Sequence, residues 1–208
     1  DWYGPYLRFG HVEPAVLGHM HRTRPLERPA MGHYERWLIA RGENEEGLRL
    51  WAAETRPGTG AAQTWNSALP AAWHNSTWIA ERAIRWFGDL KPGRPFCAWV
   101  SFPDPHHPFD CPEPWNSMYD PKNMVLPAHR VRDLERRPWW HKASLESTPQ
   151  LADPAMLKFR AEGSRVPDQS DAQLAHMTAN YYGMISQIDH NVGRIVGALE
   201  SLGLAQDT

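Results

Sequence analysis

A long amphipathic pattern near the C-terminus constrains the fold more than any other feature of this 208-residue sequence. Between residues 170 and 202, apolar side chains recur every three or four positions, which predicts an α-helix with one apolar face. They are Leu174, Met177, Tyr181, Met184, Ile185, Ile188, Val192, Ile195, Leu199 and Leu202. Ser170 and Gln173 fit a capping box, and Gly203 fits a left-handed cap. At about 1.5 Å per residue this helix is nearly 50 Å long, so it needs an extended surface to pack on.

Two shorter elements precede this helix. Residues 74–77 are of the types that cap helices, and apolar residues follow at helical spacing as far as Leu90. Pro92 and Gly93 then end the predicted helix. Residues 96–102 form a nearly continuous apolar run, which predicts a parallel strand buried on both faces, with Cys97 as a buried thiol. These elements predict an α/β fold with a mostly parallel central sheet flanked by helices.

The predicted sheet is incomplete, because one strand cannot form a sheet. The helix over 170–202 is expected to feed another strand, but the sequence ends at Thr208. Together with a first residue that is not Met, this predicts that the chain is an internal piece of a larger protein. The alternative is that weaker strands lie within residues 1–70 and 120–165.

The first 70 residues are rich in Trp, His, Arg, Gly and Pro, and show little periodicity apart from a short predicted helix over 34–41. Disordered segments are poor in aromatic residues, so the 11 tryptophans of the chain favour an irregular but packed region. We therefore expect a single domain fragment over residues 1–208, with an irregular Trp- and His-rich insertion over 1–70 and an α/β part over 74–208.

The composition excludes several classes of partner. With 41% hydrophobic and 22% charged residues and a net charge of -2, the chain lacks the basic excess of nucleic-acid-binding proteins. Its longest apolar run is far shorter than the roughly 20 residues of a membrane-spanning helix. We expect neither a nucleic-acid partner nor a membrane segment, and the sequence does not indicate a compartment.

The loop over residues 103–115 follows the predicted strand and contains five prolines, two histidines and two aspartates. Ligands of open α/β sheets bind beyond the carboxyl ends of strands, so His106 and His107 are candidates to bind an oxyanion or protonate a leaving oxygen. The alternative is that these residues only terminate the strand. A second alternative is a metal site formed by Asp104, His106, His107 and Asp110. His74 stands at the start of the helix predicted to end near Leu90. It either faces the same crevice beyond the strand as the two loop histidines or lies beside the helix cap.

Two segments resemble the sulfatase family of the alkaline-phosphatase-like superfamily. Residues 96–109, Phe-Cys-Ala-Trp-Val-Ser-Phe-Pro-Asp-Pro-His-His-Pro-Phe, are similar to a strand of the family's sheet followed by its His-x-Pro motif. Residues 181–204, within the long predicted helix, resemble the helix that precedes a metal-binding strand in that family. The resemblance covers residues 74–208 and implies a partial sulfatase fold.

The resemblance also implies an activity. Sulfatases are sulfuric ester hydrolases that use a formylglycine nucleophile and a divalent metal, usually calcium. By resemblance, His106 is a catalytic and substrate-binding residue, and His107 and His74 are weaker substrate-binding candidates. The implied substrate is a small-molecule or carbohydrate sulfate ester. A phosphodiester or phosphonate monoester hydrolase of the same superfamily is an alternative.

The nucleophile and the metal ligands of the family have no match in this chain. The Cys/Ser-x-Pro-x-Arg motif that gives formylglycine is absent, because residues 101–105 and 147–151, which come nearest, lack the arginine. The chain by itself is therefore predicted to be inactive. A function of another class stays open, namely a noncatalytic carbohydrate-binding module that stacks sugars on tryptophans of the first 70 residues.

Overall fold

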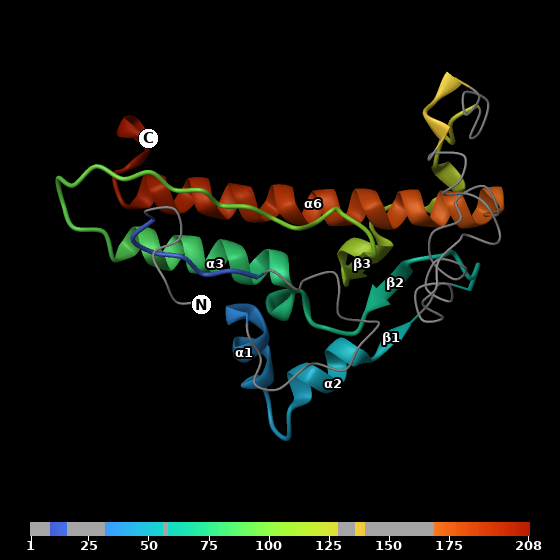
Figure 1. Cartoon of the computed structure of the whole chain (residues 1–208), viewed down its shortest axis with the longest axis horizontal. Helices are drawn as coiled ribbons and strands as arrows, with labels where there is room; N and C mark the ends of the chain where they lie inside the picture. The colour runs from blue at the N-terminus through green and yellow to red at the C-terminus, as the bar shows by residue number, and fades with distance from the viewer. Residues whose placement is uncertain (1–8, 16–31, 56–57, 129–135, 140–168) are drawn as a thin grey trace.

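Helix α6 (Asp171–Ser201) runs along one side of the computed structural model, which describes residues 9–15, 32–55, 58–128, 136–139 and 169–208 (Figure 1). The capping box is present, because the Ser170 hydroxyl accepts a hydrogen bond from the backbone N–H of Gln173, and the Gln173 side-chain oxygen accepts one from the backbone N–H of Ser170. At the other end Gly203 has φ +70°, and the Leu204 amide donates to the Leu199 carbonyl. Both predicted caps are confirmed, since this pairing is that of a Schellman motif.

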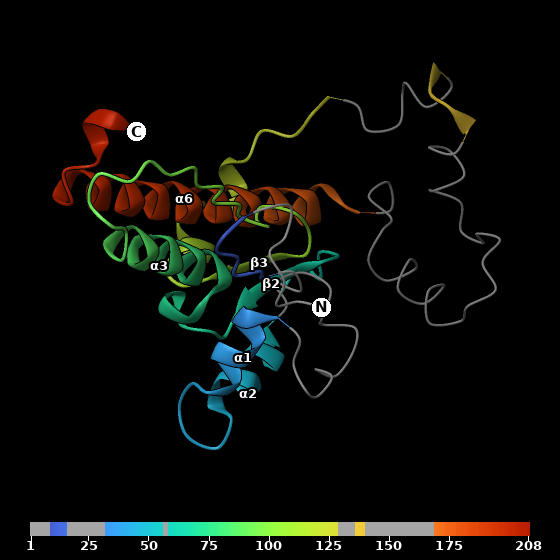
Figure 2. The same ribbon diagram turned by 60° about the vertical axis from the view of Figure 1, so that its left-hand side comes forward.

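Helix α3 (Asn75–Gly88) lies beside α6 in both ribbon views (Figures 1 and 2). It confirms the helix predicted over this part of the chain. Phe96, just beyond its end, packs its ring against Trp86 and Phe87 at centroid distances of 5.7 and 5.6 Å. The two helices form one layer, and the sheet lies at one end of it.

The sheet has three short strands in the order β1 (Glu54–Thr55), β2 (Thr64–Ser67) and β3 (Phe109–Pro112). Strand β1 is antiparallel to β2, and β3 is parallel to β2 with Thr64 opposite Phe109. Asn180 of α6 joins the helix to this sheet, because its side-chain amide donates to the carbonyls of Trp65 and Phe109 at 3.0 and 3.2 Å. One buried amide therefore holds α6 against both parallel strands.

The strand predicted over residues 96–102 is wrong for this structure. These residues are extended, but none of them pairs in a sheet, and their trace runs alongside α6 in both ribbon views (Figures 1 and 2). Trp99 is 81% exposed, and Cys97 is exposed rather than buried. A strand needs a neighbouring strand for its hydrogen bonds, and among the described residues β1, β2 and β3 pair with one another instead.

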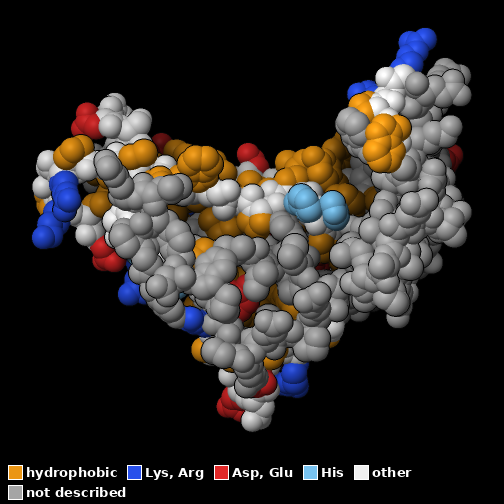
Figure 3. Space-filling model, in the orientation of Figure 1, with side chains coloured by type: hydrophobic (Ala, Val, Ile, Leu, Met, Phe, Trp, Pro, Cys, Tyr) orange, Lys and Arg blue, Asp and Glu red, His pale blue; other side chains and the backbone are white. Residues whose placement is uncertain are grey.

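The face that α6 buries matches the predicted one only in part. Much of the apolar stripe stays partly exposed, including Tyr181, Ile185 and Val192, and orange side chains line the upper edge of the molecule over α6 (Figure 3). The row that is buried against α3 and the strands includes three amide side chains, those of Asn180, Gln187 and Asn191. The predicted helix is confirmed, but within these residues its apolar stripe is buried only in part, at Leu174 and Met184.

The described part of the first 70 residues is packed, as predicted, but it is not irregular, because it contains two helices and two strands. Helices α1 (His33–Ile39) and α2 (Glu46–Ala52) contribute to a core made of Tyr34, Leu38, Trp51, Leu69 and Trp78. The rings of Tyr34 and Trp51 lie in this core, and Trp65 is also buried. Of the described tryptophans of this region, Trp51 and Trp65 are thus buried, and Trp37 is partly buried against the core.

Four single-turn 3-10 helices complete the described elements. They are η3 (Ala71–Trp73), η4 (Trp115–Ser117), η5 (Pro121–Asn123) and η8 (Ala205–Asp207). In the described ranges no helix is both long enough and apolar enough to cross a membrane.

Candidate functional site

The loop that carries His106 and His107 leads into strand β3. The His106 amide donates to the Pro103 carbonyl at 3.2 Å, which closes a turn, and both imidazoles are exposed. Their rings stack with centroids 4.1 Å apart. Because residues 96–102 form no strand, the histidines lie before the amino end of β3 and not at the carboxyl end of a paired strand.

The geometry of His106 assigns its tautomer. Its Nδ1 atom lies 2.5 Å from the backbone carbonyl oxygen of His107, and a carbonyl can only accept a hydrogen bond. In the neutral ring the proton therefore sits on Nδ1, and Nε2 is the basic nitrogen. An imidazole in this state accepts a proton at Nε2, and after protonation donates it to an oxygen.

His74 lies against the same loop but is buried, with 3% of its side chain exposed. Its Nδ1 is 3.7 Å from an Asp104 carboxylate oxygen, and its Nε2 is 4.0 Å from an Asp110 carboxylate oxygen. The structure thus brings His74 and the loop together, with His74 on the inner side of the loop. His74 is also the residue before α3, and its side chain makes no capping hydrogen bond there.

The loop is fastened to the start of α3 through a contact that the sequence did not suggest. The Ser76 hydroxyl donates to a carboxylate oxygen of Asp104, and both residues are buried. A carboxylate near a helix N-terminus is also favoured by the helix dipole. Asp104 stands two positions before His106, so this contact fixes the base of the turn that presents the histidine.

Cys111 of β3 is not suited to act as a nucleophile. Burial raises the pKa of its thiol, and the charges of neighbouring carboxylates raise it further. Because the thiolate is the reactive form, a buried thiol of this kind is inert. Residues 147–151, one of the two segments that come nearest to the nucleophile motif, lie outside the described residues.

The described residues do not fit a divalent metal site. No group of three or more His, Cys, Asp or Glu side chains is placed to hold a metal ion in the described ranges, and this includes the Asp104, His106, His107 and Asp110 alternative. His74 approaches two carboxylates only at 3.7 to 4.0 Å, and Asp104 already accepts from Ser76. We therefore assign no chemical step of these residues to a metal.

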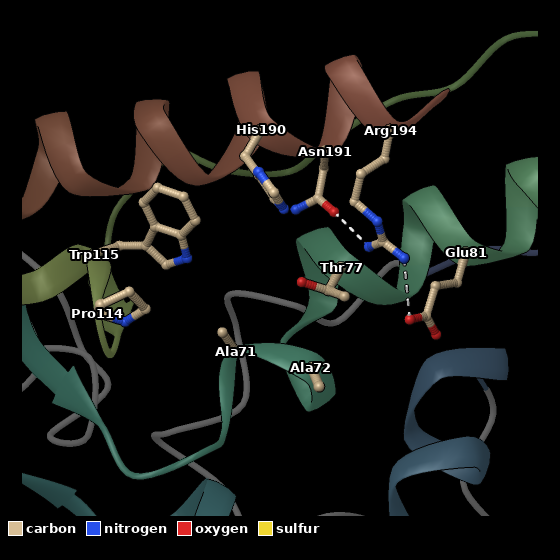
Figure 4. Close-up of a pocket in the computed structure, with 9 residues that line it drawn as sticks. All are labelled: Ala71, Ala72, Thr77, Glu81, Pro114, Trp115, His190, Asn191 and Arg194. Carbon is tan, nitrogen blue, oxygen red and sulfur yellow. Dashed lines mark hydrogen bonds and ion pairs between the residues drawn. The ribbon is translucent and has the colours of Figure 1, made fainter. Parts of the chain in front are cut away.

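A pocket of about 300 Å³ opens between α3, α6, η3 and η4 (Figure 4). Pro114 and Trp115 stand at one end, Arg194 and Glu81 at the other, and His190 and Asn191 descend from α6 between them. Thr77, Ala71 and Ala72 complete the lining. This pocket could not be predicted from the sequence, because its walls come from four separate segments.

The chain matches the family model described as Sulfatase over residues 34–208. It belongs to the sulfatase family. The multifunctional alkaline phosphatase superfamily protein PehA of Trinickia caryophylli is 27% identical over 86% of this chain and 35% of its own length. An arylsulfatase of Clostridium perfringens is 28% identical over 65% of this chain and 24% of its own length.

Solved sulfatase-fold structures resemble the chain as well. The phosphonate monoester hydrolase of Agrobacterium radiobacter has a TM-score of 0.59 and 26% identity, and the match covers 84% of this chain and 34% of that one. A phosphonate monoester hydrolase from Silicibacter pomeroyi shares the fold with a TM-score of 0.51 and 22% identity, over 69% of this chain and 27% of its own. The predicted fold class is confirmed as a partial, mixed α/β sulfatase fold, and the chain spans about a third of PehA and of the Agrobacterium enzyme.

Proposed function

We propose that this chain forms part of a hydrolase that cleaves monoanionic esters of sulfate or phosphonate. The His-x-Pro motif favours the sulfate esters of sulfatases, whereas two of the similar solved proteins are named phosphonate monoester hydrolases. The two substrates share a tetrahedral centre, a single negative charge and an ester oxygen that departs. These shared features therefore define the substrate class better than the identity of the central atom, sulfur or phosphorus.

The observation that carries this proposal is the His106 imidazole, exposed on an anchored turn with its Nδ1 directed at the His107 carbonyl oxygen. When the ester bond breaks, negative charge develops on the departing oxygen. A protonated Nε2 of His106 donates a proton or a hydrogen bond to that oxygen. His107 stacks on the His106 ring and has a supporting role in this scheme, and His74 supports the loop from inside.

The nucleophile and the metal are proposed to lie on segments beyond these 208 residues. This is supported by the absence of a Cys/Ser-x-Pro-x-Arg motif in the sequence and by the third of the relatives' length that the chain covers. A divalent metal, with calcium as our first choice, and a formylglycine nucleophile would complete the site there.

An assay of two proteins separates the parts of this proposal. Purified residues 1–208 and the longest natural protein that contains them are each given 4-nitrophenyl sulfate and 4-nitrophenyl phenylphosphonate, with and without EDTA. We expect turnover by the longer protein, sensitive to EDTA, and none by residues 1–208. Turnover by the 208-residue chain would refute the proposal that the nucleophile and the metal lie on other segments. A longer protein that is folded but inactive would refute the proposed hydrolase activity.

A further inference from the structure

The pocket between α3 and α6 has no role in the function proposed above, yet its two ends differ sharply in chemistry (Figure 4). One end has the indole of Trp115 and the ring of Pro114, and the other has the guanidinium of Arg194. We infer that this pocket binds a small aromatic carboxylate, with its ring near Trp115 and its carboxylate on Arg194.

The guanidinium of Arg194 is held in place before any ligand arrives. One terminal nitrogen donates to the Asn191 side-chain oxygen at 3.0 Å. Asn191 is buried, and its own amide donates to the Gln187 carbonyl at 2.9 Å, which fixes its orientation. A guanidinium has five N–H donors in a planar fork, so Arg194 keeps donors for a carboxylate beyond the contact with Asn191. A preorganised donor loses less entropy on binding.

Glu81 is the competitor for this donor. Its carboxylate oxygen lies 3.4 Å from the other terminal nitrogen of Arg194, and the two side chains are 45% and 34% exposed. Ion pairs this exposed contribute little, and the Glu81 side chain can turn toward solvent. A bound carboxylate therefore replaces Glu81 as the partner of Arg194, and removal of the Glu81 charge strengthens binding.

The other end of the pocket suits a flat apolar group. The Trp115 ring lies 5.5 Å from the His190 ring, between centroids, and Ala71, Ala72 and Pro114 present small apolar surfaces. A volume of about 300 Å³ stands at the lower limit for ligand pockets, which suits a single ring and not a larger molecule. Benzoate is the simplest compound that combines an aromatic ring with a carboxylate.

Titration of benzoate into the 208-residue chain tests the inference. The readouts are calorimetry and the NMR signal of the Trp115 indole N–H, assigned with Trp115→Phe. We expect benzoate to bind and to shift this signal, and neutral benzamide to do neither. Arg194→Gln should weaken binding about tenfold or more, because it removes the charge-assisted hydrogen bonds. Arg94→Gln, which makes the same charge change in an exposed turn away from the pocket lining, should leave binding unchanged.

The Glu81→Gln variant tests the inference through a gain in benzoate affinity, where Arg194→Gln tests it through a loss. It should tighten benzoate binding by up to about fivefold, because the competing carboxylate is gone. Loss of folding cannot mimic this gain. Equal binding of benzamide, weaker binding by Glu81→Gln, or an unmoved Trp115 signal at saturating benzoate would each overturn the assignment.

Discussion

The backbone carbonyl oxygen of Trp115 lies 2.4 Å from the position that a Cβ atom on Gly183 would occupy. The Cys111 sulfur lies 2.8 Å from the same position. Helix α6 therefore approaches β3 and η4 this closely because residue 183 has no side chain. The contact sets the distance between the helix and the segment that follows the histidine loop.

Gly183→Ala should destabilise the protein although alanine is the better helix former. The new methyl group meets backbone atoms that cannot move aside, and such overpacking costs about 1–3 kcal/mol. The matched control is Gly193→Ala on the same helix, where a Cβ meets nothing within 4 Å. That change should stabilise by about 0.5–1 kcal/mol, and urea unfolding of both variants measures the difference. Equal effects of the two changes would show that α6 does not pack here as described.

Gln187→Leu should raise the free energy of unfolding. Gln187 is 1% exposed, and neither atom of its side-chain amide has a hydrogen-bond partner among the described residues. A buried polar group without a partner costs about 1–3 kcal/mol, and leucine removes it at similar volume. Asn191→Leu, one turn further on, should instead lower stability, because it breaks the bonds to Gln187 and Arg194. Thermal unfolding that ranks the two variants the other way round contradicts this expectation.

Glu13 should make stability depend on pH in the acidic range. Burial acts to raise the pKa of Glu13, but the hydrogen bond and charge of Arg82, together with His11, outweigh it and lower the pKa below 4.5. A carboxyl whose pKa is lower when folded adds stability above its unfolded pKa. That stability disappears as the pH falls from about 4.5 through the folded pKa.

The measurement compares the wild type with Glu13→Gln. At pH 7 the variant should be less stable by up to about 1 kcal/mol, since the pair with Arg82 is partly exposed, and the difference should shrink below pH 4.5. In an Arg82→Gln background the same substitution should have a smaller effect. A difference that is constant with pH would mean that Glu13 is not stabilised as a carboxylate.

His106→Ala should lower kcat of the active hydrolase about 100-fold or more, because it removes the proposed proton donor. His107→Ala is the matched control, since it shares the loop and the stacked pair, and it should cost less. Steady-state kinetics on folded variants decide the question. Near-native turnover by His106→Ala together with a loss in His107→Ala would assign the role of proton donor to His107 instead. Unchanged turnover in both variants would show that the loop has only a structural role.

The helices were predictable because their signals are local. The stripe of α6, its capping box and Gly203 lie within one continuous segment, and so do the capping types and the Pro-Gly stop around α3. What the local pattern could not predict is which face of α6 is buried. Asn180, Gln187 and Asn191 are buried because of what packs against them, and their residue types suggest the opposite.

The strands and the anchor of the candidate site depend on distant partners. β2 and β3 pair over a wide sequence separation, and each has only four residues, so neither has a recognisable pattern. The apolar run at 96–102 has the pattern of a strand but lacks a strand beside it among the described residues. His106 was found from a local motif, whereas Ser76 and Asp104 are 28 positions apart, and nothing near either residue indicates the other.

The unpaired extended segment at 96–102 also affects how this chain behaves at high concentration. Phe-Cys-Ala-Trp-Val-Ser-Phe has seven residues without charge or proline and with many strand-forming types, which is the composition of segments that stack into cross-β aggregates. Its backbone groups are not used by a sheet within the described residues, and Trp99 is turned to solvent. Charged gatekeeper residues protect such edges in natural proteins, and none stands within this run. The chain on its own is thus predisposed to associate edge to edge, and a lysine at position 99 would act as the missing gatekeeper.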